Sequence, residues 1–357
     1  MVELCARPDS NVRPVRPRGR LGPRLAGDPQ AAHTLRGAIA WSMLARDSAG
    51  DIARVFGLGG DARFTGRVER GEQGQVEELV TTSGSFAVKT SFDLPELDGE
   101  DAEFQVAAGA AGVPAPGVLR TAAGTWHAQI GGSPVRVYEW VDLLPPDSMF
   151  DPAEAGWIVA AIHRTPFAGR RLEDPWYTEP VGPVAWDKLI IDLTAAGAPF
   201  VAGLAAVRDE LVALEALLER SSTVRTCHRD LWSDNLRPAS SGGLCVIDWE
   251  NCGLADPGQE IAGVVFEFGY GDADRAREVY RAYRSGGGPG MVRTRSHFSM
   301  TIAQLGHIAE MACRIWLDPT TPEDERRRQE ARVAESIDQP LTVAVIDELL
   351  DAVGTVT

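Results

Sequence analysis

The sequence predicts an α+β protein of two lobes, in which a small antiparallel sheet precedes a larger, mainly helical part. With 357 residues, of which 44% are apolar and 24% are charged, the chain is long enough for two or three domains with their own cores. Runs rich in Val, Thr and Phe are concentrated between residues 63 and 90, as in strands. After Pro145 and Pro146 the apolar pattern becomes helical.

The charge and the cysteines argue against several classes of protein. Lys and Arg number 35 against 51 Asp and Glu, and the net charge of −16 disfavours binding to nucleic acid. No apolar run approaches the roughly 18 residues of a membrane helix, so we expect no membrane partner and a cytoplasmic location. The five cysteines form no CxxC pair, which predicts free thiols rather than disulfides or a zinc site.

The first part of the chain divides into a tail and a sheet-forming lobe. Residues 1–36 mix Pro, Gly and seven Arg without periodicity, and we expect a disordered basic tail. Residues 37–141 then predict the small lobe. Its expected elements are a helix over 35–47, an antiparallel meander over 63–90, a helix over 98–112, and strands over 117–123 and 133–141.

Residues 142–357 predict the helical lobe, with one strand-and-loop segment at 223–253. The expected helices cover residues 152–164, 186–196, 203–220, 274–284, 295–316 and 321–350. In the third of these, apolar residues recur at helical spacing from Leu204 to Leu218, which indicates a buried face rather than a functional one.

The strand-and-loop segment contains the most specific motif of the chain. Residues 227–235 read Cys-His-Arg-Asp-Leu-Trp-Ser-Asp-Asn and match H-R-D-L-x-x-x-N, the catalytic loop of kinases. Asp248 follows thirteen residues after Asn235. The Ser-Ser-Gly-Gly turn at 240–243 predicts a hairpin that brings Asp248 back beside Asn235.

Phosphoryl transfer explains why these residue types stand at this spacing. A carboxylate must accept the proton of the attacking hydroxyl, and oxygen ligands must hold Mg²⁺ on the nucleotide phosphates. We therefore predict Asp230 as the catalytic base, Asn235 and Asp248 as metal ligands, and His228 as a residue that orients the loop. Taken singly, each of these residues could be an ordinary turn residue; the joint spacing favours the kinase interpretation.

The chain resembles the aminoglycoside phosphotransferase and choline kinase superfamily, whose members are small-molecule kinases with a protein-kinase-like fold. The similarity spans residues 64–316 and is specific over 227–262, where the aspartate-x-glutamate of the family stands as Asp248-Trp249-Glu250. A second family run begins at Asp256 and ends at Glu260. Because Asp256, Pro257 and Gln259 also fit a helix start with a capping box, we expect a structural role for this run.

The resemblance implies a nucleotide site in the small lobe. Phe-Ala-Val-Lys at 86–89 resembles the strand whose lysine contacts the α and β phosphates, so Lys89 takes that role. Glu103 is the expected ion-pair partner of Lys89, with Glu100 as second choice. The remaining expected contacts are the glycines of the phosphate-covering turn and the hinge residues, namely Gly71, Gly74, Glu139 and Val141.

The acceptor is less well defined by the sequence. Candidate contacts are Glu250, Glu267, Tyr270 and Glu310. The expected activity is transfer of the γ-phosphoryl group of ATP or GTP, with Mg²⁺, to a hydroxylated acceptor, and the negative charge favours a cationic one such as an aminoglycoside. A choline, amino-alcohol or sugar kinase and a nucleotide-binding regulator without turnover remain alternatives. A monomer and a homodimer are both compatible with the sequence.

Overall fold

The protein is described by a computed structural model that covers residues 48–70, 74–91 and 99–356. The predicted basic tail at 1–36, the predicted helix at 35–47 and Gly71 lie outside the described residues.

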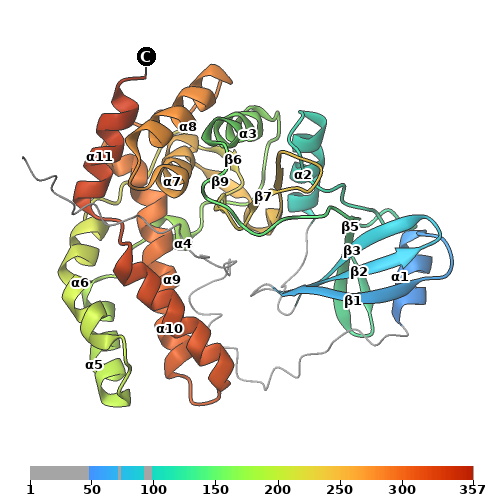
Figure 1. The fold of residues 1–357 in the computed structure, drawn as a ribbon, viewed down its shortest axis with the longest axis horizontal. Helices are drawn as coiled ribbons and strands as arrows, with labels where there is room; N and C mark the ends of the chain where they lie inside the picture. The colour runs from blue at the N-terminus through green and yellow to red at the C-terminus, as the bar shows by residue number, and fades with distance from the viewer. Residues whose placement is uncertain (1–47, 71–73, 92–98, 357) are drawn as a thin grey trace, which may run out of the picture.

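A five-stranded antiparallel sheet forms the small lobe (Figure 1). Its strands run in the spatial order β1-β2-β3-β5-β4 and comprise β1 (Arg63–Arg70), β2 (Gly74–Thr81), β3 (Gly84–Ser91), β4 (Ala128–Ile130) and β5 (Ser133–Glu139). The predicted meander is confirmed. The predicted strand at 117–123 is wrong, because this segment makes one isolated bridge, Val118 to Tyr138, and then turns where the Thr121 N–H donates to the Thr125 carbonyl.

The helix α1 (Ser48–Phe56) covers one face of the sheet. Ile52 and Phe56 are buried against sheet residues that include Leu79 and Val137. The next helix, α2 (Glu100–Ala110), packs instead against the large lobe, because the Phe104 ring contacts the Trp249 ring edge-on at 5.4 Å. The helix α2 therefore lies at the junction of the two lobes (Figure 1).

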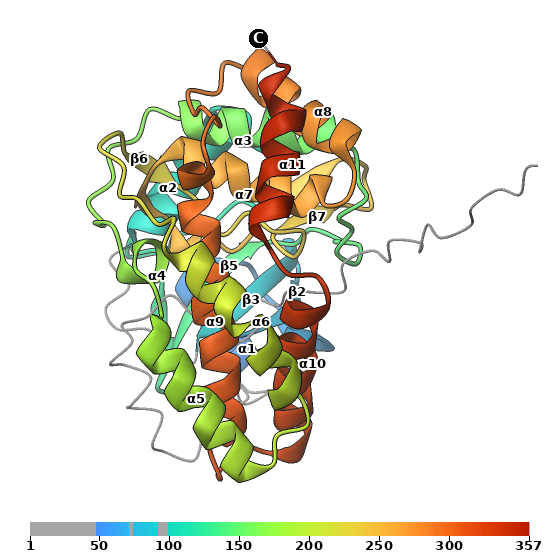
Figure 2. The same ribbon diagram turned by 90° about the vertical axis from the view of Figure 1, so that its left-hand side faces the viewer.

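The large lobe is mainly helical, as predicted. The helix α9 runs through it, with α5, α6 and α10 around one end and α3, α7, α8 and α11 toward the other (Figure 2). The bounds are α3 (Pro152–Arg164), α4 (Pro175–Thr178), α5 (Pro183–Ala196), α6 (Val201–Glu215), α7 (Pro257–Gly269), α8 (Ala273–Ser285), η3 (Arg295–Phe298), α9 (Ser299–Leu317), α10 (Glu323–Asp338) and α11 (Val343–Gly354).

The predicted single helix over 321–350 is two helices, α10 and α11. Pro340 stands between them and cannot donate the backbone hydrogen bond that would continue α10. The chain restarts at Thr342, whose hydroxyl accepts the N–H of Val345 and caps α11. None of the helices in the described part of the chain is long and apolar enough to cross a membrane.

Short strands support the region between α6 and α7. They are β6 (Arg225–Cys227) paired with β9 (Gly253–Ala255), and the hairpin of β7 (Leu236–Pro238) with β8 (Leu244–Val246), which a one-turn helix η2 (Trp249–Asn251) follows. The predicted turn at 240–243 is confirmed. The segment that leaves the sheet joins this hairpin, since the Leu144 N–H donates to the Pro238 carbonyl and the Ser240 N–H to the Asp142 carbonyl.

Candidate active site

The loop between β6 and β7 holds the predicted base. Asp230 is buried, with 1% of its surface exposed, and its carboxylate accepts two side-chain amides. The Asn235 Nδ2 donates to Asp230 Oδ2 and to the Asp230 carbonyl, both at 2.9 Å, and the Asn251 Nδ2 donates to Oδ2 at 3.0 Å. The structure thus brings Asp230 and Asn235 together as the motif predicts. Asn251 is a further contact that the sequence analysis missed, although it follows Asp248 by only three residues.

Arg229 anchors this loop to the rest of the large lobe. Its guanidinium donates to the carbonyls of Asn251 and Cys252, at 2.6 and 3.2 Å, and lies over the Tyr177 ring at 4.4 Å. The Gln304 side chain donates to the Arg229 carbonyl at 2.7 Å. The residue adopts φ = 64°, a left-handed conformation that bulky residues rarely take, and these contacts hold it there.

His228 lies where a loop-orienting residue is expected. Its Nε2 donates to the Ile247 carbonyl at 3.1 Å, and its ring packs against the Trp249 ring at 4.9 Å. Burial lowers the pKa of His228 to about 4, so the neutral ring is favoured. The ring ties the catalytic loop to the residue before Asp248.

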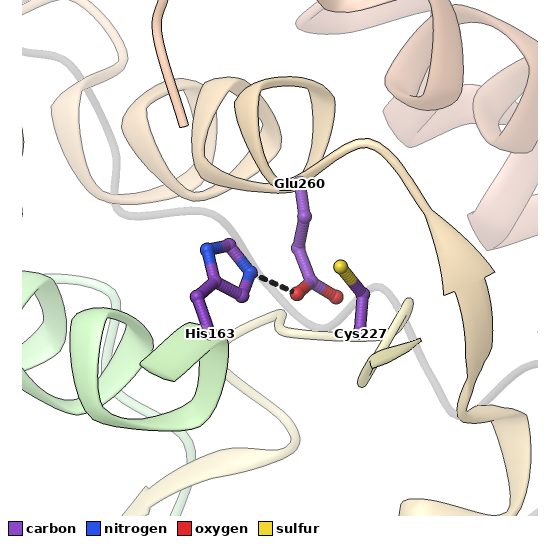
Figure 3. Close-up of side chains that lie close together, drawn as sticks. All are labelled: His163, Cys227 and Glu260. Atoms are coloured by element: carbon purple, nitrogen blue, oxygen red, sulfur yellow. Dashed lines mark hydrogen bonds and ion pairs between the residues drawn. The ribbon is translucent and has the colours of Figure 1, made fainter. Parts of the chain in front are cut away.

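A buried polar network contacts the catalytic loop, and Figure 3 shows its His163 and Glu260 side chains. The Glu260 carboxylate accepts the Arg229 N–H with one oxygen and bonds the His163 Nε2 with the other at 2.6 Å. His163 Nδ1 bonds the Tyr283 hydroxyl at 2.8 Å. Although burial alone would raise the pKa of Glu260, His163 outweighs it and lowers that pKa. The structural role predicted for Glu260 agrees with this arrangement.

These residues also include three potential metal ligands, His163, Cys227 and Glu260, whose ligand atoms lie within 4.8 Å of one another (Figure 3). The His163 and Glu260 atoms are bonded to each other, and the Cys227 Sγ donates to the Ala255 carbonyl at 3.5 Å. Burial raises the pKa of Cys227, which keeps the thiol protonated. Hydrogen bonding therefore accounts for the cluster, and the four described cysteines are free, as predicted.

The helix α7 begins as predicted at Asp256, whose carboxylate accepts the Gly258 N–H, with Pro257 in the first turn. The expected capping box is wrong. The Gln259 side chain donates to the Glu219 carbonyl at 3.1 Å and so ties α7 to the end of the α6 segment instead of closing the cap.

The hairpin brings the backbone segments of the two predicted metal ligands side by side. The Ile247 N–H donates to the Asn235 carbonyl at 3.0 Å, which places Asp248 beside Asn235. Asn235 bonds Asp230 through its Nδ2 alone, which directs its amide oxygen away from Asp230. A carboxylate and an amide oxygen suit Mg²⁺, which takes oxygen ligands and retains waters for phosphate oxygens to replace. The donor set fits the predicted ion.

Lys89 on β3 reaches across the junction of the lobes to this point. Its Nζ lies 2.8 Å from Asp248 Oδ1 and 2.7 Å from Glu250 Oε1. Burial alone would lower the pKa of Lys89, but the two carboxylates outweigh it and raise that pKa. Burial, together with the neighbouring Glu250, raises the pKa of Asp248; Lys89 and Arg136 hold the pKa of Glu250 well below its usual range despite burial.

The expected ion pair between Lys89 and Glu103 is wrong for this structure. The Glu103 side chain is 41% exposed and lies 3.4 Å from the Arg170 guanidinium. Glu100 is buried and accepts the backbone N–H groups of Arg170 and Arg171, at 2.6 and 3.1 Å. Residues of one helix that are two positions apart point in directions roughly 200° apart, so Glu103 faces away when Asp101 faces inward.

The remaining expected nucleotide contacts are the phosphate-covering turn and the hinge. Gly74 opens β2 and pairs with Ser91 at the end of β3, two residues beyond Lys89, so the start of β2 lies at the Lys89 end of the sheet. Glu139 ends β5, and its N–H donates to the Gly117 carbonyl at 2.7 Å. Val141 follows in the segment that joins the lobes.

The four candidate acceptor contacts each lie against other groups of the protein. Glu250 belongs to the Lys89 cluster, and buried Glu267 accepts the Ser233 N–H at 3.2 Å beneath the catalytic loop. Tyr270 packs edge-on against the Phe266 ring at 5.6 Å, and Glu310 bonds Arg314 at 2.7 Å on α9. Glu250 and Glu267 therefore support the nucleotide and catalytic segments, which argues against acceptor contacts for both.

The chain resembles known proteins in its sequence and in its fold. Residues 66–297 match the model of the phosphotransferase enzyme family. No curated protein matches the chain.

Three solved structures show the same fold. A spectinomycin phosphotransferase in complex with ADP and spectinomycin is 12% identical with a TM-score of 0.64, and the match covers 87% of this chain and 99% of the other. An amicoumacin kinase in complex with AMP-PNP, Ca²⁺ and Ami is 16% identical with a TM-score of 0.52, covering 81% and 92%. A choline/ethanolamine kinase family protein from Mesorhizobium loti is 17% identical with a TM-score of 0.51, covering 87% and 99%.

Proposed function

The chain belongs to the phosphotransferase enzyme family, and on that premise we propose that it is a kinase of small molecules that transfers the γ-phosphoryl group of ATP or GTP to a hydroxyl group of a cationic acceptor. The observation that carries the proposal is the position of Asp230. Its carboxylate is held by two amides, from Asn235 and Asn251, on the loop next to the ion pair of Lys89 and Asp248.

Each residue takes one part of the reaction. The Asp230 carboxylate accepts the proton of the attacking hydroxyl, and the amides of Asn235 and Asn251 orient it. Asn235 and Asp248 would hold Mg²⁺, which when bound neutralises charge on the phosphates. Lys89 binds the α and β phosphates, and His228 keeps the catalytic loop against the metal segment.

The edges of the nucleotide site are assigned by their place in the fold. Glu139 ends β5, and Val141 follows it in the segment that leads into the large lobe. We assign these two residues to the hinge, whose backbone groups would contact the purine base. The sequence assigns Gly71 and Gly74 to the phosphate-covering segment, because glycine would let backbone N–H groups approach the phosphates closely.

A cationic acceptor is favoured by the charge of the chain and by the similar structures. The net charge of −16 raises the local concentration of cations. The solved structures of this fold include enzymes named for spectinomycin, amicoumacin and choline or ethanolamine. An amino-alcohol or sugar kinase of the same fold is the second candidate.

An acceptor panel tests the proposal. Purified protein with Mg²⁺ and ATP or GTP is assayed for nucleoside diphosphate release with aminoglycosides, other basic antibiotics, choline, ethanolamine and amino sugars. We expect release with at least one cationic acceptor, and we expect Asp230→Ala to abolish it while ADP binding survives. Near-normal turnover of Asp230→Ala would contradict the base assignment, and nucleotide binding without release on any acceptor would favour a regulator.

A further inference from the structure

A second buried cation lies beside Lys89. In the pairing of β3 with β5, Lys89 stands directly opposite Arg136, so the two side chains share one face of the sheet. The Lys89 side chain is 12% exposed and that of Arg136 is 5% exposed. Like charges in direct opposition destabilise a sheet unless acids compensate for them. Lys89 and Arg136 therefore need nearby carboxylates that compensate for their two positive charges.

Three carboxylates supply this compensation. The side chain of Asp101 on α2 is fully buried and forms a bidentate ion pair with the Arg136 guanidinium. Glu250 Oε1 lies 2.7 Å from Lys89 Nζ, 3.7 Å from Arg136 Nη1, and accepts the Tyr138 hydroxyl at 3.4 Å. Asp248 completes the set at 2.8 Å from Lys89 Nζ. One oxygen of Glu250 thus connects both cations.

From this geometry we infer that Glu250, Arg136 and Asp101 act as positioning residues for Lys89, in place of a direct glutamate partner on α2. Glu250 holds the Lys89 ammonium, Arg136 holds Glu250, and Asp101 ties Arg136 to α2. The inference rests on the proposed function, because it concerns how that nucleotide site keeps its lysine in place.

The arrangement has a consequence for ligand binding. Lys89 contacts both Asp248 and Glu250 in this structure, and Asp248 is also the proposed metal ligand. If Asp248 held an ion, Glu250 would remain as a partner that keeps the Lys89 ammonium in place. Arg136 is well suited to hold Glu250, because its planar guanidinium can contact Asp101 and Glu250 together.

The test measures ADP binding without metal by calorimetry, with thermal unfolding measured in parallel. We expect Glu250→Gln to raise the ADP Kd by at least about tenfold and Asp101→Asn by about fivefold, as for loss of charged hydrogen bonds. Arg136→Lys, which keeps the charge but loses the planar guanidinium, should fall between wild type and Asp101→Asn. The double variant Asp101→Asn/Glu250→Gln should bind no more weakly than Glu250→Gln alone, because Asp101 acts through Glu250.

Two comparison variants separate positioning from folding. Glu215→Gln removes another buried carboxylate, at the end of α6, which accepts the Trp186 indole N–H at 2.9 Å. This variant should lower the melting temperature without changing the ADP Kd. Glu103→Gln tests the competing assignment on α2 and should change the Kd by less than about twofold, as expected for an exposed ion pair.

Three outcomes would overturn the inference while the proposed function stands. They are a Glu103→Gln effect as large as that of Glu250→Gln, an Asp101→Asn variant that melts earlier but binds ADP normally, and additive losses in the double variant. If Asp101→Asn does not fold, Arg136→Lys decides alone, and its normal ADP binding would overturn the inference. A wild-type protein that binds neither ADP nor GDP would overturn the proposed function and the inference with it.

Discussion

Two residues of the candidate site adopt left-handed backbone conformations, Arg229 with φ = 64° and Asp248 with φ = 62°. Such conformations cost of order 1–3 kcal/mol in a non-glycine residue, and contacts elsewhere must compensate for that cost. Arg229 obtains them from carbonyl groups and Asp248 from the Lys89 ammonium. The backbone turns sharply at the two points where a base and a metal ligand have to be presented.

The first prediction concerns Asp248. Asn tolerates the left-handed conformation, so Asp248→Asn keeps the backbone and removes the charge. We expect the Mg²⁺ concentration needed for half-maximal activity to rise at least about tenfold, because a carboxylate ligand becomes a neutral amide. A titration of activity with Mg²⁺ at saturating nucleotide measures this. Asp234→Asn on the catalytic loop is the matched control, and an equal rise in that variant would contradict the assignment.

The second prediction concerns His228 and pH. Its pKa is about 4 in the folded protein and about 6.5 when unfolded, so the unfolded chain binds more protons between these values. The stability that the neutral ring contributes is complete above pH 6.5 and is lost as the pH falls toward 4. The full effect is about 3 kcal/mol, taking 1.36 kcal/mol for each pKa unit.

Urea unfolding at several pH values measures this effect as a difference between wild type and His228→Asn. The free energy of unfolding of wild type should fall more steeply between pH 6.5 and 4 than that of the variant, because only wild type carries the titrating ring. Parallel slopes for the two proteins would show that His228 is not buried as a neutral ring.

At the scale of single residues, the sequence predicts those parts of the site that lie in one contiguous motif. Asp230, Asn235 and Asp248 stand at spacings set by one loop and one hairpin, so the motif alone indicates that they meet. Arg136 and Asp101 carry no such signal. Their pairing depends on the register of β3 with β5 and on the rotation of α2, and neither can be read from the sequence spacing.

Among the elements, α2 has a position that its place in the sequence does not suggest. It follows the third strand of the small lobe, yet it packs against η2 and the segment around Phe167. Glu100 accepts two backbone N–H groups of the large lobe, which fixes the start of the helix. Through Glu100 and Asp101, α2 therefore contacts both the large lobe and Arg136 in the sheet.

The third prediction concerns the apolar contact of α2. Phe104 is fully buried between Phe167 and Trp249, and Phe104→Ala should lower the free energy of unfolding by about 3–5 kcal/mol. Val106 on the same helix is 47% exposed, so Val106→Ala should stay within about 0.5 kcal/mol of wild type. Denaturant unfolding measures both. Equal losses in the two variants would contradict the packing described for α2.

The elements themselves are predicted best where periodicity is long. The bounds of α3 agree with the predicted helix at 152–164, whereas the prediction for 117–123 places a strand in a turn. The three residues of β4 are too few to show alternation, and β4 owes its existence to pairing with β5. The predicted helix at 321–350 runs across Pro340, although proline already indicates the break between α10 and α11 in the sequence.

For the whole molecule, the excess of acids is a property that acts at a distance. Individual charges are screened within about 10 Å at 0.1 M salt, so the attraction of a cationic acceptor depends on ionic strength. The position of single acids does not identify the acceptor, because the candidates Glu250 and Glu267 have structural partners.

The fourth prediction follows from that charge. If the acceptor is cationic, its KM should rise several-fold between about 0.05 and 0.5 M KCl, while a neutral hydroxylated acceptor should show little change. Steady-state kinetics at fixed Mg²⁺-nucleotide measures both. An unchanged KM for a cationic acceptor would indicate that short-range contacts, and not the net charge of −16, select it.

The ion pairs of Lys89 also bear on whether the small lobe could exist as a separate fragment. Expressed alone, residues 48–141 would retain two cations on one face of the sheet, Lys89 and Arg136, but only one of their acids, Asp101. The two missing acids, Asp248 and Glu250, lie more than a hundred residues further along the chain. A sheet that looks like an autonomous unit would thus expose an unbalanced pair of charges, and co-expression with the second fragment should be required to recover it in folded form.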